Sequence, residues 1–258
     1  MAGSRPAVPP RQYAKRLIKA KDLAEALDQI DWLWRYCSTT GVMMPIEIDA
    51  KDFRDQFAAL ADCFPPARAA YEACMAGAYD QALAGAPTLP PPAKGQLVPA
   101  ETGDFARYLL LAEHVQTPEQ LVAAFKHLDA VSHAAAQWQY PEMVIHLIQH
   151  DEFAYMGTFT PAFDAATRQS YCDDLLEDYR MARMDTTGTG PQAARAKAQF
   201  EDAIQRLALL RLVYAHTQRS AALVRLEDVA RAVLKPEEVR SLVQATQGIE
   251  SRARVAGS

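Results

Sequence analysis

Residues 22–37 read DLAEALDQIDWLWRYC, and this stretch decides the fold class. Its apolar side chains recur at intervals of three and four residues, at Leu23, Leu27, Ile30, Trp34 and Cys37. That interval matches the 3.6-residue period of an α-helix and places these side chains on one face. Asp22 can cap the helix at its start, and Gly41 can end it. The stretch therefore predicts an amphipathic helix with one buried face.

The same period recurs along most of the chain, usually behind a proline or an aspartate that can begin a helix. These starts predict further helices from Asp49, Pro65, Asp104, Thr117-Pro118, Pro141, Pro161, Gln192, Leu226 and Pro236. Val42–Ile48 is the one segment with strand character, and Pro45 restricts it to an edge or a connector. We therefore expect an all-α protein of roughly nine helices with bundle-like packing.

A proline-rich segment suggests how the chain is organised. Residues 85–103, GAPTLPPPAKGQLVPAETG, contain five prolines and three glycines, which is typical of a spacer or a long surface loop. It predicts two helical lobes, residues 22–84 and 104–258, preceded by an arm at residues 1–21. The sequence DTTGTGP at residues 185–191 predicts a flexible break within the second lobe.

Charge is sorted along the chain although the whole carries only −5. Residues 1–21 hold six Lys/Arg and no acidic residue, whereas residues 22–217 hold 14 Lys/Arg against 27 Asp/Glu. Residues 218–258 hold seven basic and five acidic residues. Such sorting informs on binding partners rather than on fold.

The N-terminal arm is the strongest candidate for a charged interface. Arg11, Lys15 and Lys19 recur every four residues, with Arg16 beside them and Tyr13 available to stack. An arm of this kind can neutralise phosphates without reading sequence, or it can bind an acidic protein surface. Arg11, Lys15, Arg16 and Lys19 are therefore the predicted contacts to nucleic acid or to another acidic partner.

A second candidate site is a possible metal-binding helix face. Glu142, His146 and His150 lie four residues apart, so one helix would project all three from one stripe. Two histidines at this spacing, with a carboxylate, can bind a divalent ion such as zinc. The same trio also reads as a polar helix face next to Pro141, where an acidic residue favours a helix start.

The C-terminal stretch 226–243, LEDVARAVLKPEEVRSLV, has two readings. Its order of apolar positions resembles a helix-turn-helix, whose second helix would present Glu237, Glu238, Arg240 and Ser241. The turn lacks the usual glycine, and two glutamates would repel phosphates at the start of that helix. A plain helical hairpin is the other reading, and the sequence leaves both open.

Three features of the sequence indicate the cellular location of the protein. The N-terminus MAGSRPAVPP lacks the apolar core of a secretory signal, and no apolar run approaches the roughly 20 residues that span a bilayer. The four cysteines are scattered without a CxxC pair, as is typical of reduced thiols. We therefore expect a cytoplasmic protein with no membrane association.

Together these patterns favour a non-catalytic helical adaptor or assembly subunit. It would bind a protein partner, with nucleic acid as a further candidate partner through the basic termini. The alternative is a metal-dependent hydrolase or oxidase that uses Glu142, His146 and His150. The sequence assigns no catalytic residue, we expect no cofactor, and the oligomeric state stays open.

Overall fold

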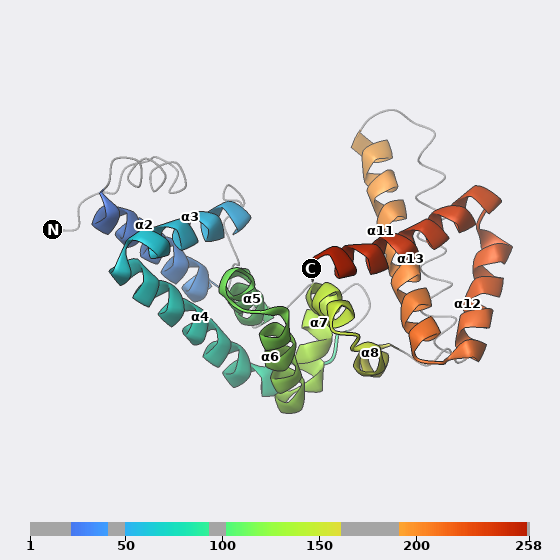
Figure 1. Ribbon diagram of the computed structural model, residues 1–258, viewed down its shortest axis with the longest axis horizontal. Helices are drawn as coiled ribbons and strands as arrows, with labels where there is room; N and C mark the ends of the chain where they lie inside the picture. The colour runs from blue at the N-terminus through green and yellow to red at the C-terminus, as the bar shows by residue number, and fades with distance from the viewer. Residues whose placement is uncertain (1–21, 41–49, 93–101, 161–190, 257–258) are drawn as a thin grey trace. The chain divides into compact units, whose positions relative to one another are not determined.

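The computed structural model describes residues 22–40, 50–92, 102–160 and 191–256 (Figure 1). These ranges contain ten α-helices and one 3-10 helix, with no strand among them. The elements are α2 (Leu23–Thr40), α3 (Ala50–Cys63), α4 (Pro65–Gly85), η1 (Ala86–Thr88), α5 (Gly103–Val115), α6 (Pro118–Val131), α7 (His133–Gln149), α8 (Phe153–Phe159), α11 (Pro191–His216), α12 (Ser220–Val233) and α13 (Pro236–Ala256). The prediction of an all-α protein with packed helices is confirmed.

Three of the segments for which the sequence predicts a structure are not among the described residues. The candidate strand Val42–Ile48, the helix expected from Pro161 and the break at residues 185–190 lie outside the described residues. Pro191, the last residue of that expected break, is instead the first residue of α11.

The chain divides into two compact units, Met1–Met143 and Val144–Ser258, so the division falls inside α7. This position differs from the proline-rich segment 85–103 that the sequence suggests. The helices on either side of that segment, α4 and α5, pack against each other within the first unit.

The described part of the proline-rich segment is attached to the first unit. Leu89 is buried, and the indole N–H of Trp138 donates a hydrogen bond to the carbonyl of Pro90 at 2.8 Å. Proline content alone predicts a spacer. A single buried leucine and one main-chain acceptor are enough to fix such a segment against a helix.

A row of aromatic rings holds α2, α3 and α4 together in the first unit. Trp34 stacks on Phe53, Phe53 meets Phe57 edge-on, and Phe57 lies 4.8 Å from Tyr71 between ring centroids. The row extends to α5, because the hydroxyl of Tyr71 donates a hydrogen bond to the carbonyl of Leu111 at 2.8 Å. Each aromatic pair adds about 0.5–1.5 kcal/mol to the free energy that burial itself supplies.

One charged side chain is buried in the same core. The side chain of Arg107 on α5 is only 2% exposed and forms an ion pair with Asp104, one turn earlier. Its Nη1 also donates to the carbonyl of Cys37 at 3.3 Å, which connects α5 to α2. Burial lowers the pKa of Arg107 from its usual value. The guanidinium is thus held in the core by a carboxylate and a main-chain carbonyl.

In the second unit, α12 and α13 both pack against α11, as Figure 1 shows. Apolar side chains from all three helices are buried there, among them Leu207, Tyr214, Leu226 and Leu242. The predicted starts of α11 and α13, at Gln192 and Pro236, agree with the structure to within one residue, whereas α12 begins at Ser220, six residues before the predicted Leu226.

Arg219 links the C-terminal end of α8 to the segment that follows α11. Arg219 follows α11 and donates to the carbonyls of Thr160 at 3.1 Å and Gly157 at 3.0 Å, so it caps the C-terminal end of α8. A Cβ atom on Gly157 would lie 3.3 Å from the methyl group of Thr217 and 3.4 Å from Nη2 of Arg219. The absence of a side chain at Gly157 therefore permits this close approach.

Two predicted helix starts are confirmed in atomic detail. The main-chain N–H of Glu25 donates to Oδ1 of Asp22 at 3.3 Å, so Asp22 caps α2. Thr117 and Gln120 form a reciprocal capping box at the start of α6, with Pro118 in the first turn.

The helix start predicted at Pro141 is wrong. Pro141 lies inside α7, which begins eight residues earlier at His133 and continues to Gln149. Proline lacks the N–H that would bond the carbonyl of Gln137, and α7 continues despite this loss, with buried side chains on both sides of Pro141, such as Ala136 and Leu147. Met143 and Leu147, on either side of the predicted ligand His146, are fully buried.

Candidate functional site

The predicted basic contacts Arg11, Lys15, Arg16 and Lys19 lie outside the described residues. The described chain begins where their segment ends, at the Asp22 cap of α2. The surface of α2 is therefore the first part of the fold that follows this segment.

One face of α2 exposes two large aromatic side chains. Trp32 is 37% exposed and Tyr36 is 44% exposed, and their rings stack with centroids 5.9 Å apart and planes at 23°. Asp28, one turn before Trp32, is also exposed. The four-residue interval puts Asp28, Trp32 and Tyr36 on one side of the helix, and we call these three residues the α2 stripe.

The opposite side of α2 explains why the α2 stripe faces outward. Ala26, Ile30, Leu33 and Cys37 are buried against the first unit. The side of the helix that points away from this buried face is exposed, and it includes both rings of the α2 stripe.

The electrostatics of α2 are acidic. Four acidic residues, Asp22, Glu25, Asp28 and Asp31, stand against one basic residue, Arg35, within the described range 22–40. Arg35 forms an ion pair with Asp31 one turn away, so its charge is directed at its own helix. Asp28 lies one turn before Trp32 on the same side of the helix, and a carboxylate and an aromatic face both attract a Lys or Arg side chain.

The predicted metal ligands are placed on and just after α7. Glu142 is exposed and His146 is half-buried within the helix, whereas His150 follows its last residue, Gln149. No group of three or more His, Cys, Asp or Glu side chains suited to a metal ion occurs in the described ranges.

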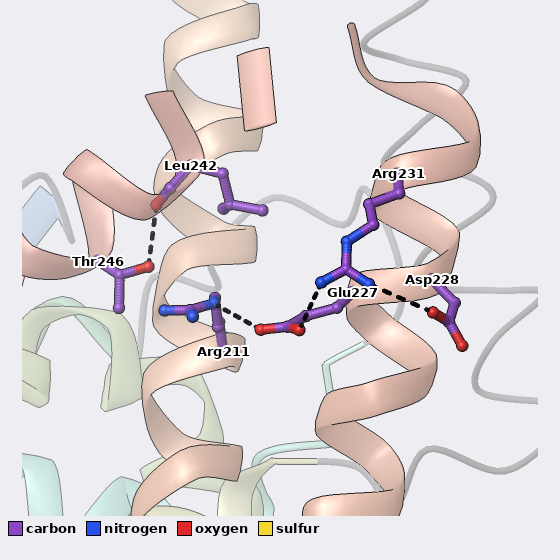
Figure 2. Close-up of polar contacts among 6 residues, drawn as sticks. All are labelled: Arg211, Glu227, Asp228, Arg231, Leu242 and Thr246. Atoms are coloured by element: carbon purple, nitrogen blue, oxygen red, sulfur yellow. Dashed lines mark hydrogen bonds and ion pairs between the residues drawn. The ribbon is translucent and has the colours of Figure 1, made fainter. Parts of the chain in front are cut away.

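The helix that contains the first part of the stretch 226–243, α12, is linked to α11 through the carboxylate of Glu227. Figure 2 shows Glu227 of α12 between Arg211 of α11 and Arg231, with nitrogen–oxygen distances of 3.2 Å to each. Arg231 also lies 3.7 Å from Asp228. Figure 2 further shows the hydroxyl of Thr246 donating to the carbonyl of Leu242 within α13.

The start of α13 uses one of the residues that a helix-turn-helix would present. A carboxylate oxygen of Glu238 accepts a hydrogen bond from the main-chain N–H of Lys235 at 2.7 Å. Glu237 and Arg240 are exposed on the same first turns. Glu238 thus helps to cap the start of α13. Both the helix-turn-helix and the plain hairpin stay predictions.

The described thiols in the core are poor nucleophiles. Burial raises the pKa of Cys74 to about 12 and also raises the pKa of Cys37. A thiol with a raised pKa stays protonated near neutral pH, and the thiolate is the reactive form. Cys63, by contrast, is an exposed thiol.

The α2 stripe was not singled out in the sequence analysis. The signal was present, because Trp32 and Tyr36 lie off the apolar stripe that identifies the helix and share a four-residue interval with Asp28. An aromatic pair outside the predicted buried face indicates a surface role.

Comparison with protein families, with curated proteins and with solved structures found no match for this chain. Across the described ranges, no helix has both the length and the apolar character needed to cross a membrane.

Proposed function

We propose that this chain is a non-catalytic helical assembly subunit whose α2 stripe binds a Lys/Arg-rich segment of a second copy. The observation that carries the proposal is the exposed, stacked Trp32–Tyr36 pair on an acidic helix. The occupant is residues 1–21 of the second copy, which hold six Lys/Arg and no acidic residue.

Charge and spacing support this pairing. Arg11, Lys15 and Lys19 recur at the same four-residue interval as Asp28, Trp32 and Tyr36. Cations at that interval could reach the aspartate and both ring faces in turn, which combines ionic and cation–π attraction. Exposed cation–π contacts contribute about 0.5–1 kcal/mol each.

Reciprocal exchange gives a reason to favour a second copy. Each copy carries one arm and one α2 stripe. In a two-fold dimer the arm of each copy binds the stripe of the other, so two identical contacts form and no arm or stripe is left to bind a third copy. An arm that bound the stripe of its own chain would leave the protein monomeric. Self-association is therefore the property that separates the two arrangements.

The experiment is a measurement of mass by sedimentation equilibrium over a wide range of protein concentration. We expect dimers at low salt that dissociate at high salt. Replacing Trp32 and Tyr36 with Ala should weaken dimerisation about a hundredfold, since a two-fold pair loses four cation–π interactions of about 0.7 kcal/mol each. Val224→Ala is the matched control, because Val224 is 56% exposed and lies in the other unit.

A mixing test distinguishes exchange from a general loss of stability. Chains with Lys15, Arg16 and Lys19 changed to Glu keep the α2 stripe, whereas Trp32→Ala/Tyr36→Ala chains keep the arm. Each variant alone should dimerise much more weakly than the wild type, but a mixture of the two restores one complete arm–stripe contact per pair and should associate more tightly than either variant alone. A wild-type protein that stays monomeric at every concentration, or a mixture with no association, would refute the proposal.

Nucleic acid is the other candidate partner of the basic arm, because its cations have no acidic neighbour within residues 1–21. A retardation assay with generic DNA and RNA tests this. Binding to phosphates should weaken steeply with salt, and the slope should fall by about 0.7–0.9 for each phosphate that the Lys15/Arg16/Lys19→Glu variant no longer neutralises. Binding that this variant retains in full would exclude the arm as the nucleic-acid-binding segment.

The proposal includes a cytoplasmic location. It is supported by the thiol state of Cys37, Cys63 and Cys74, none of which forms a disulfide within the described residues, because reduced cysteines are typical of that compartment.

A further inference from the structure

A pocket of about 310 Å³ lies within the second unit and plays no part in the proposed assembly. It is formed where the ends of α7 and α11 meet the start of α8 and the middle of α13. The lining side chains are Ile148, Gln149, Asp151, Phe153, His216 and Glu250.

The end of α7 builds one wall. The N–H of Glu152 donates to the carbonyl of Leu147 at 2.9 Å, and the N–H of Asp151 donates to the carbonyl of Ile148 at 3.1 Å. These two bonds are the pair that closes a helix in a Schellman motif. Asp151 takes the left-handed position of that motif, with φ at 53°, and its carboxylate lines the pocket.

Two flat rings build a second wall. The imidazole of His216 stacks on Phe153 with centroids 3.8 Å apart and planes at 11°. His216 is the last residue of α11, and its Nε2 lies 3.7 Å from Oε1 of Glu250 on α13. The ring pair and the carboxylate therefore belong to one corner of the pocket.

The polar lining is dominated by hydrogen-bond acceptors. Oε1 of Gln149 is buried and has no hydrogen-bond donor among the described residues. The carboxylates of Asp151 and Glu250 add negative charge, and no Lys or Arg is among the six lining side chains. Both α7 and α11 end here, and a helix C-terminus carries partial negative charge.

We propose that this pocket binds a guanidinium or alkylammonium group. Such a group supplies the donor that Gln149 lacks, pairs with Glu250 and Asp151, and lies against the rings of Phe153 and His216. A planar guanidinium matches the ring wall best, because it can stack and donate in its own plane at once. A pocket of this volume is at the small end of ligand sites and suits one such head group.

Two sources can present this chemistry, a free small cation or an arginine side chain of a partner peptide. We would titrate the full-length protein with agmatine and, separately, with a capped tripeptide that has arginine at its centre. Isothermal calorimetry gives the affinity, and the NMR signals of the His216 ring report the site. Saturable binding of agmatine identifies a free cation as sufficient, whereas binding of the tripeptide alone identifies a side chain.

Three variants test the assignment. Glu250→Gln should weaken binding about tenfold or more, because it removes a charge-assisted contact. Gln149→Leu should also weaken binding, because it removes the oxygen that would accept a hydrogen bond from the ligand. The fold should be at least as stable as in the wild type, because this buried oxygen has no hydrogen-bond donor among the described residues. Glu237→Gln is the matched control, since Glu237 is an exposed carboxylate on the same helix outside the pocket.

The affinities of the three variants and the wild type decide whether the pocket is a cation site. Loss of affinity in Glu250→Gln and Gln149→Leu, with wild-type affinity in Glu237→Gln, supports the site. Equal affinity in all four proteins, or no saturable binding of either cation, would overturn it. Because the pocket residues are absent from the α2 stripe, this result is independent of the outcome of the sedimentation experiment.

Discussion

Removing the carboxylate of Asp104 should destabilise the first unit severely. The side chain of Arg107 is 2% exposed and that of Asp104 is 19% exposed, so the pair lies almost wholly out of water. Asp104→Asn keeps the size of the side chain but leaves the guanidinium without its counter-charge. Breaking a buried pair in this way costs about 3–5 kcal/mol, because one charge stays buried and uncompensated.

The geometry gives little to offset that cost. Within the described residues, Nε of Arg107 already has no hydrogen-bond partner, and the bond from Nη1 to the carbonyl of Cys37 is long at 3.3 Å. Replacing Arg107 itself with Met leaves the carboxylate of Asp104 instead, which is 19% exposed and lies in the first turn of α5, where a helix favours negative charge, so we expect a smaller loss of about 1 kcal/mol. Asp104→Asn should therefore be much more harmful than Arg107→Met, although each removes one member of the same pair.

The assay is thermal unfolding followed by circular dichroism. A loss of 3–5 kcal/mol should lower Tm by roughly 10 °C, since each kcal/mol is worth about 2–4 °C in a chain of this size. Asp62→Asn is the control, because the Asp62–Arg68 pair is exposed and its atoms are 3.8 Å apart. If Asp104→Asn and Asp62→Asn lower Tm equally, the buried pair does not stabilise the fold as argued.

Three further predictions concern a backbone position, the cysteines and the histidines. Gln218 has φ at 56°, a left-handed conformation that glycine adopts without strain. Gln218→Gly should therefore raise the free energy of unfolding, measured by urea titration, by about 1 kcal/mol, whereas Gln218→Ala should not raise it. Brief alkylation of the native protein should label exposed Cys63 and spare Cys74, whose pKa of about 12 keeps it protonated; equal labelling in mass spectra would contradict this. Elemental analysis should find no stoichiometric metal, and changing His146 and His150 to Ala should lower the free energy of unfolding by about 1 kcal/mol, because His146 is half-buried. Stoichiometric zinc or iron that this double variant releases would instead support the metal-dependent alternative.

The helices were predictable where their ends carry local chemistry. Asp22 and Thr117 cap their helices with their own side chains, so a few neighbouring residues specify each start. Pro141 shows the limit of that reasoning. A proline can begin a helix or lie within one, and the choice depends on packing by residues that are distant in sequence.

Long-range contacts explain the other differences. Arg107 lies on a buried face because Asp104 and the carbonyl of Cys37 receive its charge, and the latter is 70 residues away. The proline-rich segment packs through Leu89 and Pro90 because Trp138 lies beside it. Neither arrangement leaves a periodic signal. The pocket in the second unit likewise joins residues from Ile148 to Glu250, which no local pattern connects.

The arginine that caps α8 bears on how the chain folds during synthesis. The carbonyl of Gly157 and the guanidinium of Arg219 are 62 residues apart, so the acceptor leaves the ribosome well before its donor. At about 5–20 residues per second, that interval is on the order of 3–12 s. A helix of seven residues is too short to persist alone over such a time. The order of α8 is therefore set by the arrival of a later part of the chain, and a ribosome that stalls before residue 219 would hold α8 without its cap.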